Sequence, residues 1–511
     1  MSALGMFITE YLAASAGSSF VKQLIVILAI FVLGAVLTNR LLEDISWQLR
    51  SVLIFPTGLS AFVITAYAMI VTSIPYNRWT VSVIMLAEAL AAVLSNRRSY
   101  SGDALSSYGK HMAVTVAAAA VLAAFATSGI TPVSISNDTM YFFRRYPDSI
   151  VYFEGLRDQF DFWMTDTGLG TVSVDTLPAL FGFSESFGIR EFFHIGFVAF
   201  FGICVYERAS KRLEKKAAVA AAVLITLFLE TATPFVILGH WALANMYFME
   251  MFFIAAYSAT DHENSTGRVT PLLLVALSLF RIEGTMFVVW LILCIALYTD
   301  AGKKLAAYCL LPMTLLFGGY CLNVFVRFYV LDDIYLFLTP VKAVLLVAAM
   351  ASAGIYLAFI FPRLGAGIRR RLPLIYTGAL LLGNAVLFTR DPGLYLGNIM
   401  AFYSNLFRQS GWGMLPYFVI AMTFLAIVEY MLAYFGKESR FDGPDPFTLT
   451  LTAGFILMVL AASYGRGDIL AEDVGDSGNR VLLQVVPLVV MLFGDMFTKI
   501  SSCGKTDINE E

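Results

Sequence analysis

Long apolar runs separated by short polar connections make up most of this chain. A helix needs about 20 apolar residues to cross a bilayer, and such runs recur from residue 21 to residue 498. The pattern predicts about 13 to 15 membrane-spanning helices. The candidate spans are residues 21–39, 52–73, 79–95, 111–129, 193–207, 217–236, 240–258, 269–280, 282–299, 305–327, 340–361, 372–390, 413–436, 447–464 and 480–498.

One apolar run, residues 269–299, carries two opposite charges near its middle, in the segment LSLFRIEG. Arg281 and Glu283 are two residues apart, so they would not face each other on one helix, and Gly284 follows them. We therefore predict two half-helices that meet at Arg281. Charged groups inside an apolar segment are costly and mark function by default, here the holding of a phosphate. The alternative is a structural Arg–Glu tie between helices.

The longest stretch that no span can absorb is the loop 130–192. It contains nine carboxylates and four arginines, and aromatic residues run through it. Disordered segments are poor in aromatic residues, so this loop is expected to fold as a cap on the membrane domain. Ile150, Phe153, Leu156 and Phe160 recur three or four residues apart after Pro147. That spacing predicts an amphipathic helix lying on the membrane surface.

Composition sets the class of protein. Of 511 residues, 59% are hydrophobic and 14% are charged, against about 25% charged in soluble domains. The predicted fold is an all-α polytopic membrane bundle with a folded first loop, carrying amphipathic helices, on the outer face. Five cysteines show no paired spacing, and no basic face predicts nucleic-acid binding. Walker A, nucleophile-elbow and zinc motifs are absent from the sequence.

The distribution of basic residues predicts the orientation, because cytoplasmic loops collect Lys and Arg. The segment 207–216 holds five basic residues and the segment 362–371 holds four. Alternation from these places the loop 130–192 on the outer side and the C-terminus in the cytoplasm. We expect a multi-pass protein of a bacterial inner or cell membrane. The predicted divisions are N-terminal helices 1–110, a core 111–300, C-terminal helices 301–498 and a tail 499–511.

Asp138 is the first candidate catalytic residue, because it follows the span that enters the outer loop. A carboxylate at the membrane surface can act as the base for an acceptor hydroxyl. The alternative is that Asp138 caps a helix, since Asn137, Asp138 and Thr139 are all good N-caps. The same triplet also fits a glycosylation acceptor.

Two further polar groups lie at predicted ends of spans. Arg480 begins an apolar helix after a polar run containing Asp476, where it would meet a lipid phosphate or extend to the interface. His240 and Asn245 follow Pro234 at the outer end of two spans, where they would line a cavity or serve packing. The residues assigned to substrate or lipid-phosphate binding are Arg281, Glu283, Arg480, Arg144, Asp166, His240, Asn245 and Asp476.

Taken in order, these stretches resemble the GT-C superfamily of integral membrane glycosyltransferases, which use polyprenyl-phosphate-linked sugars. The resemblance rests on SNDTMYFFRRYPDSIVYFEGL, WMTDTGLGTVSVDTLPALFGF, ETATPFVILGHWALANMYF, LSLFRIEG and GNRVLLQVVPLV. It covers residues 111 to about 300 and residues 470–498, and the order of the motifs carries it. By this resemblance Asp138 matches the first-loop catalytic Asp, and Arg281 and Arg480 match positions near the lipid phosphate.

The chain departs from the superfamily in two places. Three extra predicted spans precede the first loop, and Asn137 stands where a second acidic residue is often found. A metal site would need more oxygen ligands there, so a divalent cation is left open and no metal ligand is assigned.

The resemblance implies an inverting transfer of a sugar from a polyprenyl-phosphate donor to a glycan or lipid-linked acceptor on the outer face of the membrane. The expected partners are that donor, that acceptor and membrane lipids. One alternative is a lipid-linked oligosaccharide polymerase or ligase, which would depend on arginines rather than an Asp. A secondary transporter is a second alternative, because transporters also contain half-helices that meet at the midplane.

Overall fold

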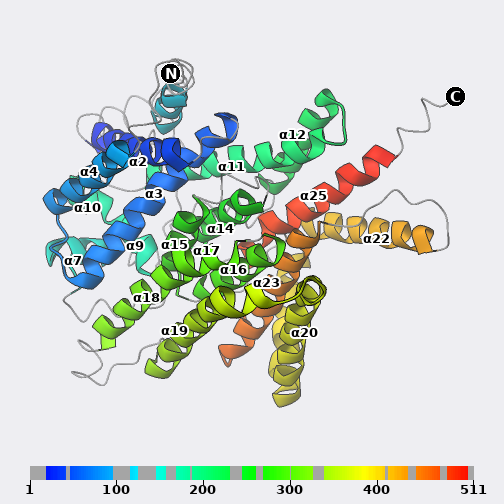
Figure 1. The fold of residues 1–511 in the computed structure, drawn as a ribbon. Helices are drawn as coiled ribbons and strands as arrows, with labels where there is room; N and C mark the ends of the chain where they lie inside the picture. Colours follow the sequence, from blue (N-terminus) through cyan, green and yellow to red (C-terminus); the bar gives the residue numbers. More distant parts are fainter. Residues whose placement is uncertain are drawn as a thin grey trace. The chain divides into compact units, whose positions relative to one another are not determined.

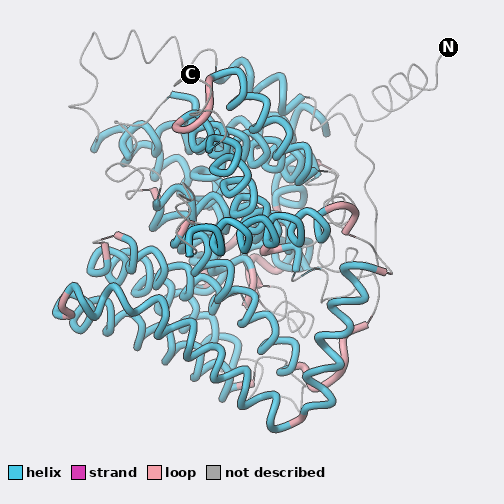
Figure 2. The backbone as a smooth tube through the Cα atoms, turned by 90° about the vertical axis from the view of Figure 1, so that its right-hand side faces the viewer, coloured by secondary structure: helices cyan, strands magenta, loops and turns pink. Residues whose placement is uncertain are grey.

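The computed structural model shows an all-helical chain: the described residues form helices and no strand (Figures 1 and 2). Contacts divide the chain into unit 1 (residues 1–197, 240–289 and 301–362) and unit 2 (residues 198–239, 290–300 and 363–511). The divisions predicted from the sequence stay predictions. The structure describes residues 19–41, 47–95, 115–124, 146–156, 168–183, 187–230, 244–260, 269–282, 284–299, 301–325, 339–408, 412–434, 445–471, 480 and 482–503.

Each predicted span contains a helix, but only some of these helices are long enough to cross a membrane. Within the described residues, seven helices are long and apolar enough to cross a membrane, by length and composition. The predicted total of about 13 to 15 spans is therefore not confirmed. The seven are Val21–Thr38, Trp47–Thr72, Gly188–Ser210, Gly302–Val324, Pro340–Arg363, Ala366–Arg390 and Pro446–Gly465.

Unit 1 is built around α3, whose span is 83% buried. This helix contacts α2, α4, α9, α15 and α18, which surround it. The elements of unit 1 are α2 (Ser19–Leu41), α3 (Trp47–Thr72), α4 (Arg78–Ser95), α7 (Tyr146–Tyr152), α9 (Leu169–Asp175), α10 (Leu177–Phe181), the start of α11 (Phe187–Ser210), α14 (Ala244–Thr260), α15 (Thr270–Phe280), the start of α16 (Gly284–Tyr298), α17 (Gly302–Leu305), η4 (Ala306–Leu310), α18 (Leu311–Val324), α19 (Pro340–Ile355) and η6 (Tyr356–Ile360).

Two glycines allow α2 and α3 to cross in backbone contact. A Cβ atom at Gly34 would overlap the carbonyl of Ile54, and one at Gly58 would overlap the carbonyl of Ile30. Small residues permit this close approach in membrane helices, where packing rather than the hydrophobic effect drives association.

The predicted break in the run 269–299 is confirmed. The helix α15 ends at Phe280, Arg281 is extended (φ −144°, ψ 139°), and α16 begins at Gly284. A Cβ at Gly284 would overlap the Phe248 ring, so α14 also requires a glycine here. Glu283 lies outside the described residues.

The loop 130–192 contains helices where it is described, but the predicted surface helix is shorter than expected. The helix α7 ends at Tyr152, and Glu154 and Gly155 then take positive φ values of 53° and 153°. Ile150 and Leu156 are both buried, yet they do not share one helix. The prediction of a single stripe through Leu156 is therefore wrong, and its last member, Phe160, lies outside the described residues.

Unit 2 contains one helix that the hydrophobic pattern did not predict. The helix α21 starts at Pro392, where the Asp391 side chain accepts a hydrogen bond from the Leu394 N–H at 2.9 Å. The helix α23 contacts α20, α21 and α25. The helices of unit 2 are the ends of α11 and α16, α12 (Lys215–Glu230), α20 (Ala366–Arg390), α21 (Pro392–Phe407), α22 (Leu415–Tyr434), α23 (Pro446–Gly465) and α25 (Val486–Cys503).

The crossing of α2 and α3 predicts a large effect of one methyl group. We expect Gly58→Ala to lower stability by about 1–3 kcal/mol or more, because the helices must separate. Gly196→Ala in α11 is the control, since no atom lies within 4 Å of the added Cβ. Thermal unfolding of the purified full chain in detergent measures both. Equal unfolding midpoints for the two variants would contradict the close crossing.

Candidate functional site

The end of α15 is held by the start of α9. A Cβ at Gly170 would lie 2.7 Å from the carbonyl carbon of Leu279, so only glycine fits there. Gly168 has φ +85°, and a Cβ there would lie 2.4 Å from the carbonyl oxygen of Phe280 and 2.7 Å from the Cα atom of Arg281. The Thr171 hydroxyl donates to the Phe280 carbonyl at 3.1 Å. The helix α9, in the loop 130–192, therefore packs directly on the helix break at Arg281.

The other end of α9 carries a buried ion pair. Asp175, the last residue of α9, is fully buried and accepts a hydrogen bond from Arg190 of α11 at 2.6 Å. The guanidinium of Arg190 also lies 4.9 Å from the centre of the Tyr247 ring of α14. Arg190 thus joins α9, α11 and α14 through one charged and one cation–π contact.

A second pair lies one helical turn further along α11 and α14. Nδ1 of His194 is 2.5 Å from Oε1 of Glu250, whose side chain is only 3% exposed. His194 follows Arg190 by four residues, and Glu250 follows Tyr247 by three, so each pair of side chains shares a helix face. The two helices therefore meet through two successive polar contacts.

Tyr247 connects these pairs with the helix break. Its ring stacks on Phe280 at 5.6 Å with an interplanar angle of 28°. We call Asp175, Arg190, His194, Tyr247 and Glu250 the polar centre. Tyr247 therefore contacts Phe280, the residue that immediately precedes Arg281 in the chain.

The connection between α3 and α4 fixes the polar centre from another side. The Tyr76 hydroxyl forms a hydrogen bond of 2.7 Å with Thr176, the residue after Asp175. Burial raises the pKa of Tyr76, so its hydroxyl keeps its proton at neutral pH. The Tyr76 N–H donates to the Glu154 carbonyl at 3.0 Å. The α3–α4 connection therefore contacts the loop 130–192. The predicted alternation of spans also puts these two segments on one side of the membrane.

Arg281 and Asn245 are the two predicted binding residues that the structure describes in unit 1. Arg281 is half-buried at the helix break, and Asn245 is buried in the first turn of α14. Arg480 is described in unit 2. The remaining predictions lie outside the described residues, namely Asp138, Arg144, Asp166, His240, Glu283 and Asp476.

The polar centre itself was not predicted. Asp175 and Arg190 are among the nine carboxylates and four arginines of the loop 130–192, and composition does not separate buried carboxylates from exposed ones. Glu250 did carry a usable signal: it interrupts the apolar helix ANMYFMEMFFIAAYSAT, as Arg281 interrupts its own run.

The charged groups described so far form pairs rather than a metal-binding cluster. Within the described residues, no group of three or more His, Cys, Asp or Glu side chains could hold a metal ion. Arg190 is already paired with Asp175, whereas Arg281 lies at the helix break. A planar guanidinium can bind a phosphate through charge-assisted hydrogen bonds.

Comparison with known proteins adds no assignment: no family, curated protein sequence or solved structure matches the chain.

The buried Asp175–Arg190 pair predicts an asymmetric response to mutation. We expect Asp175→Ala to lower the free energy of unfolding by about 3–5 kcal/mol, because it leaves Arg190 without its carboxylate. The double variant Asp175→Leu/Arg190→Met should recover much of that loss, since no charge then stays unpaired. Chemical unfolding of the full chain in detergent measures both.

Asp468→Ala is the matched control for this prediction. Asp468 forms an ion pair of 3.5 Å with Arg466, but both side chains are more than a third exposed. Its removal should change stability by less than about 1 kcal/mol. Equal losses at Asp175 and Asp468 would show that the Asp175 pair is solvated.

Proposed function

We propose that this chain is an integral membrane glycosyltransferase that moves a sugar from a polyprenyl-phosphate donor to a glycan or lipid-linked acceptor. The proposal combines the ordered motifs of the sequence with one structural observation. That observation is the helix break that brings Arg281 beside the polar centre. Seven apolar helices are compatible with the membrane location that such a donor requires.

The break supports phosphate binding for a physical reason. An arginine between two apolar helices is costly to maintain, so its retention favours a role with an anionic ligand. Its backbone is extended, and α9 holds the preceding residue in place through Thr171. The ligand would therefore meet a guanidinium whose backbone is already fixed, which lowers the entropy lost on binding.

The reaction requires a base and a stabilised leaving group. Asp138 would take the proton of the acceptor hydroxyl as the acceptor oxygen bonds to the anomeric carbon. The bond from that carbon to the phosphate breaks, and its electron pair leaves with the phosphate. Arg281 would offset part of the phosphate charge, so the protein contributes positioning and electrostatic stabilisation. Attack from the opposite face inverts the anomeric carbon.

Two alternatives share parts of this interpretation. A lipid-linked oligosaccharide polymerase or ligase would use the same lipid phosphate but would depend on arginines rather than on Asp138. A secondary transporter would use the broken helix to bind its substrate. The transferase releases free polyprenyl phosphate from its donor, whereas the transporter does not, and this product distinguishes the two classes.

Arg281→Lys tests the phosphate site. We expect a loss of polyprenyl-phosphate binding close to that of Arg281→Ala, because a point charge does not replace a planar fork. Binding of a short-chain polyprenyl phosphate to the purified protein measures it. Arg390→Lys, at the exposed end of α20, is the control. Unchanged binding in both Arg281 variants would show that Arg281 has a structural role and does not bind the phosphate.

Asp138→Asn tests the base. Asparagine keeps the size and capping ability of aspartate but cannot take a proton. We expect the release of polyprenyl phosphate from a polyprenyl-phosphate sugar to slow by about 100- to 10,000-fold, with unchanged donor binding. Asp468→Asn, which changes an exposed carboxylate of unit 2, is the control. Near-normal turnover with Asp138→Asn would make Asp138 a helix cap and move the search to Asp148, Glu154 or Asp166.

A further inference from the structure

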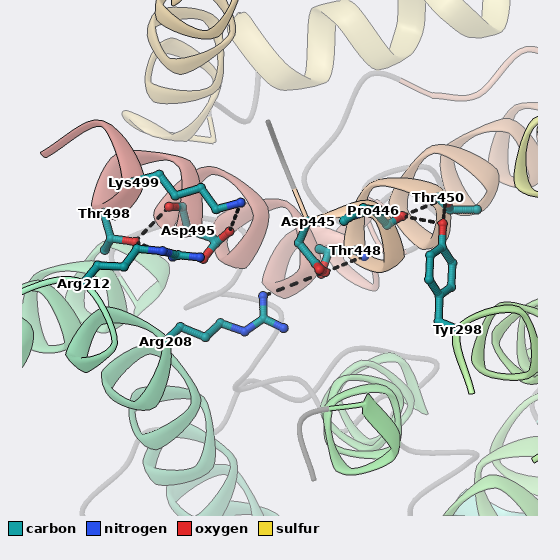
Figure 3. Close-up of polar contacts among 10 residues, drawn as sticks. All are labelled: Arg208, Arg212, Tyr298, Asp445, Pro446, Thr448, Thr450, Asp495, Thr498 and Lys499. Carbon is teal, nitrogen blue, oxygen red and sulfur yellow. Dashed lines mark hydrogen bonds and ion pairs between the residues drawn. The ribbon is translucent and has the colours of Figure 1, made fainter. Parts of the chain in front are cut away.

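The turn between α11 and α12 is fixed to the last described helix of unit 2. Arg212 donates to Oδ1 of Asp495 at 2.6 Å and approaches the Thr498 hydroxyl at 3.4 Å (Figure 3). Lys499, one turn beyond Asp495 on α25, lies 3.5 Å from Oδ2. Asp495 is only 3% exposed, so one buried carboxylate is shared by two cations. This ties the turn firmly to α25.

A second contact joins the same turn to α23. Arg208 lies 3.9 Å from Asp445, whose carboxylate also caps α23 by accepting from the Thr448 N–H and hydroxyl (Figure 3). Both arginines of the turn therefore already have carboxylate partners within unit 2. Their charges act within the fold and are not the surface that a ligand would meet first.

Three lysines in and directly after this turn have no such partners in the part of the chain that the structure describes. Lys211, Lys215 and Lys216 are exposed, and none forms a hydrogen bond or ion pair with any described residue. Lys215 and Lys216 are the first two residues of α12, the end of a helix where cations are unfavourable. We call these three residues the lysine surface. An anion would relieve both their mutual repulsion and their conflict with the helix dipole.

An apolar stripe continues from the lysine surface along α12. Val219, Val223 and Leu227 are 46%, 51% and 54% exposed, and they follow Lys215 at intervals of four residues. In a membrane protein such a stripe contacts lipid chains, while lysines at its end lie at the level of the headgroups. The lysines and the apolar stripe of α12 therefore follow one another as the headgroup and the acyl chains do in a phospholipid.

We propose that the lysine surface binds the headgroups of anionic phospholipids. The ion pairs of Arg208 and Arg212 hold the backbone of the turn, so the lysines are presented on a fixed support. The apolar stripe favours a lipid over a free phosphate, which would contact the lysines alone. This surface lies in unit 2 and is independent of the proposed transfer reaction.

Lipid binding to the purified full chain in a neutral detergent tests this proposal, with native mass spectrometry counting bound phosphatidylglycerol and phosphatidylcholine. Each lysine near an anionic surface strengthens binding about fivefold. The variant Lys211→Gln/Lys215→Gln/Lys216→Gln should therefore lose about a hundredfold in affinity for phosphatidylglycerol. Replacing the three lysines by arginine keeps the charge and should keep the preference.

The variant Arg390→Gln/Arg408→Gln/Arg466→Gln is the matched control, because it removes three exposed positive charges elsewhere in unit 2. It should keep the preference for phosphatidylglycerol. Equal affinity losses in the two glutamine variants would mean that only net charge matters and would overturn the proposal. So would a wild-type unfolding midpoint that rises as much with inorganic phosphate as with phosphatidylglycerol.

Discussion

Backbone contact between α9 and the end of α15 is the constraint on which the candidate site depends. It exists because Gly168 and Gly170 have no side chains to separate the two segments. Since α9 is only seven residues long, its position at one end determines where Asp175 lies at the other. The carboxylate then fixes Arg190, and Arg190 in turn covers Tyr247. A contact between two backbones thus sets the positions of charged groups on three helices.

The charged groups described in both units follow one energetic rule. Burying a charge is tolerated when a partner and hydrogen bonds replace the lost water, and removing one partner then costs more than removing both. Asp175 and Glu250 in unit 1 and Asp495 in unit 2 are nearly or fully buried, and each has a basic partner. Lys211, Lys215 and Lys216 are exposed instead, so water solvates their charges and no burial cost has to be offset.

Hydrophobic periodicity predicted most helices and the break at Arg281, because both are local properties of the chain. The charged residues Arg281 and Glu283, followed by Gly284 within an apolar run, are enough to indicate the break. The polar centre could not be predicted in the same way, since Asp175 and Arg190 become partners only through the packing of α9. The helix α21 was missed for another reason: its apolar run is short, although Asp391 and Pro392 form a recognisable helix start.

The polar ties around the helix break also determine how the molecule can move there. A broken helix exposes carbonyl groups that no water can satisfy in an apolar environment. Two threonines bind these groups: Thr171 donates to Phe280, and Thr285 donates to Ser278 at 3.3 Å. The first of these bonds joins the residue before Arg281 to α9, in the loop 130–192, so bending at Arg281 would act against it. The break is therefore not a free hinge but a joint whose stiffness is set by α9.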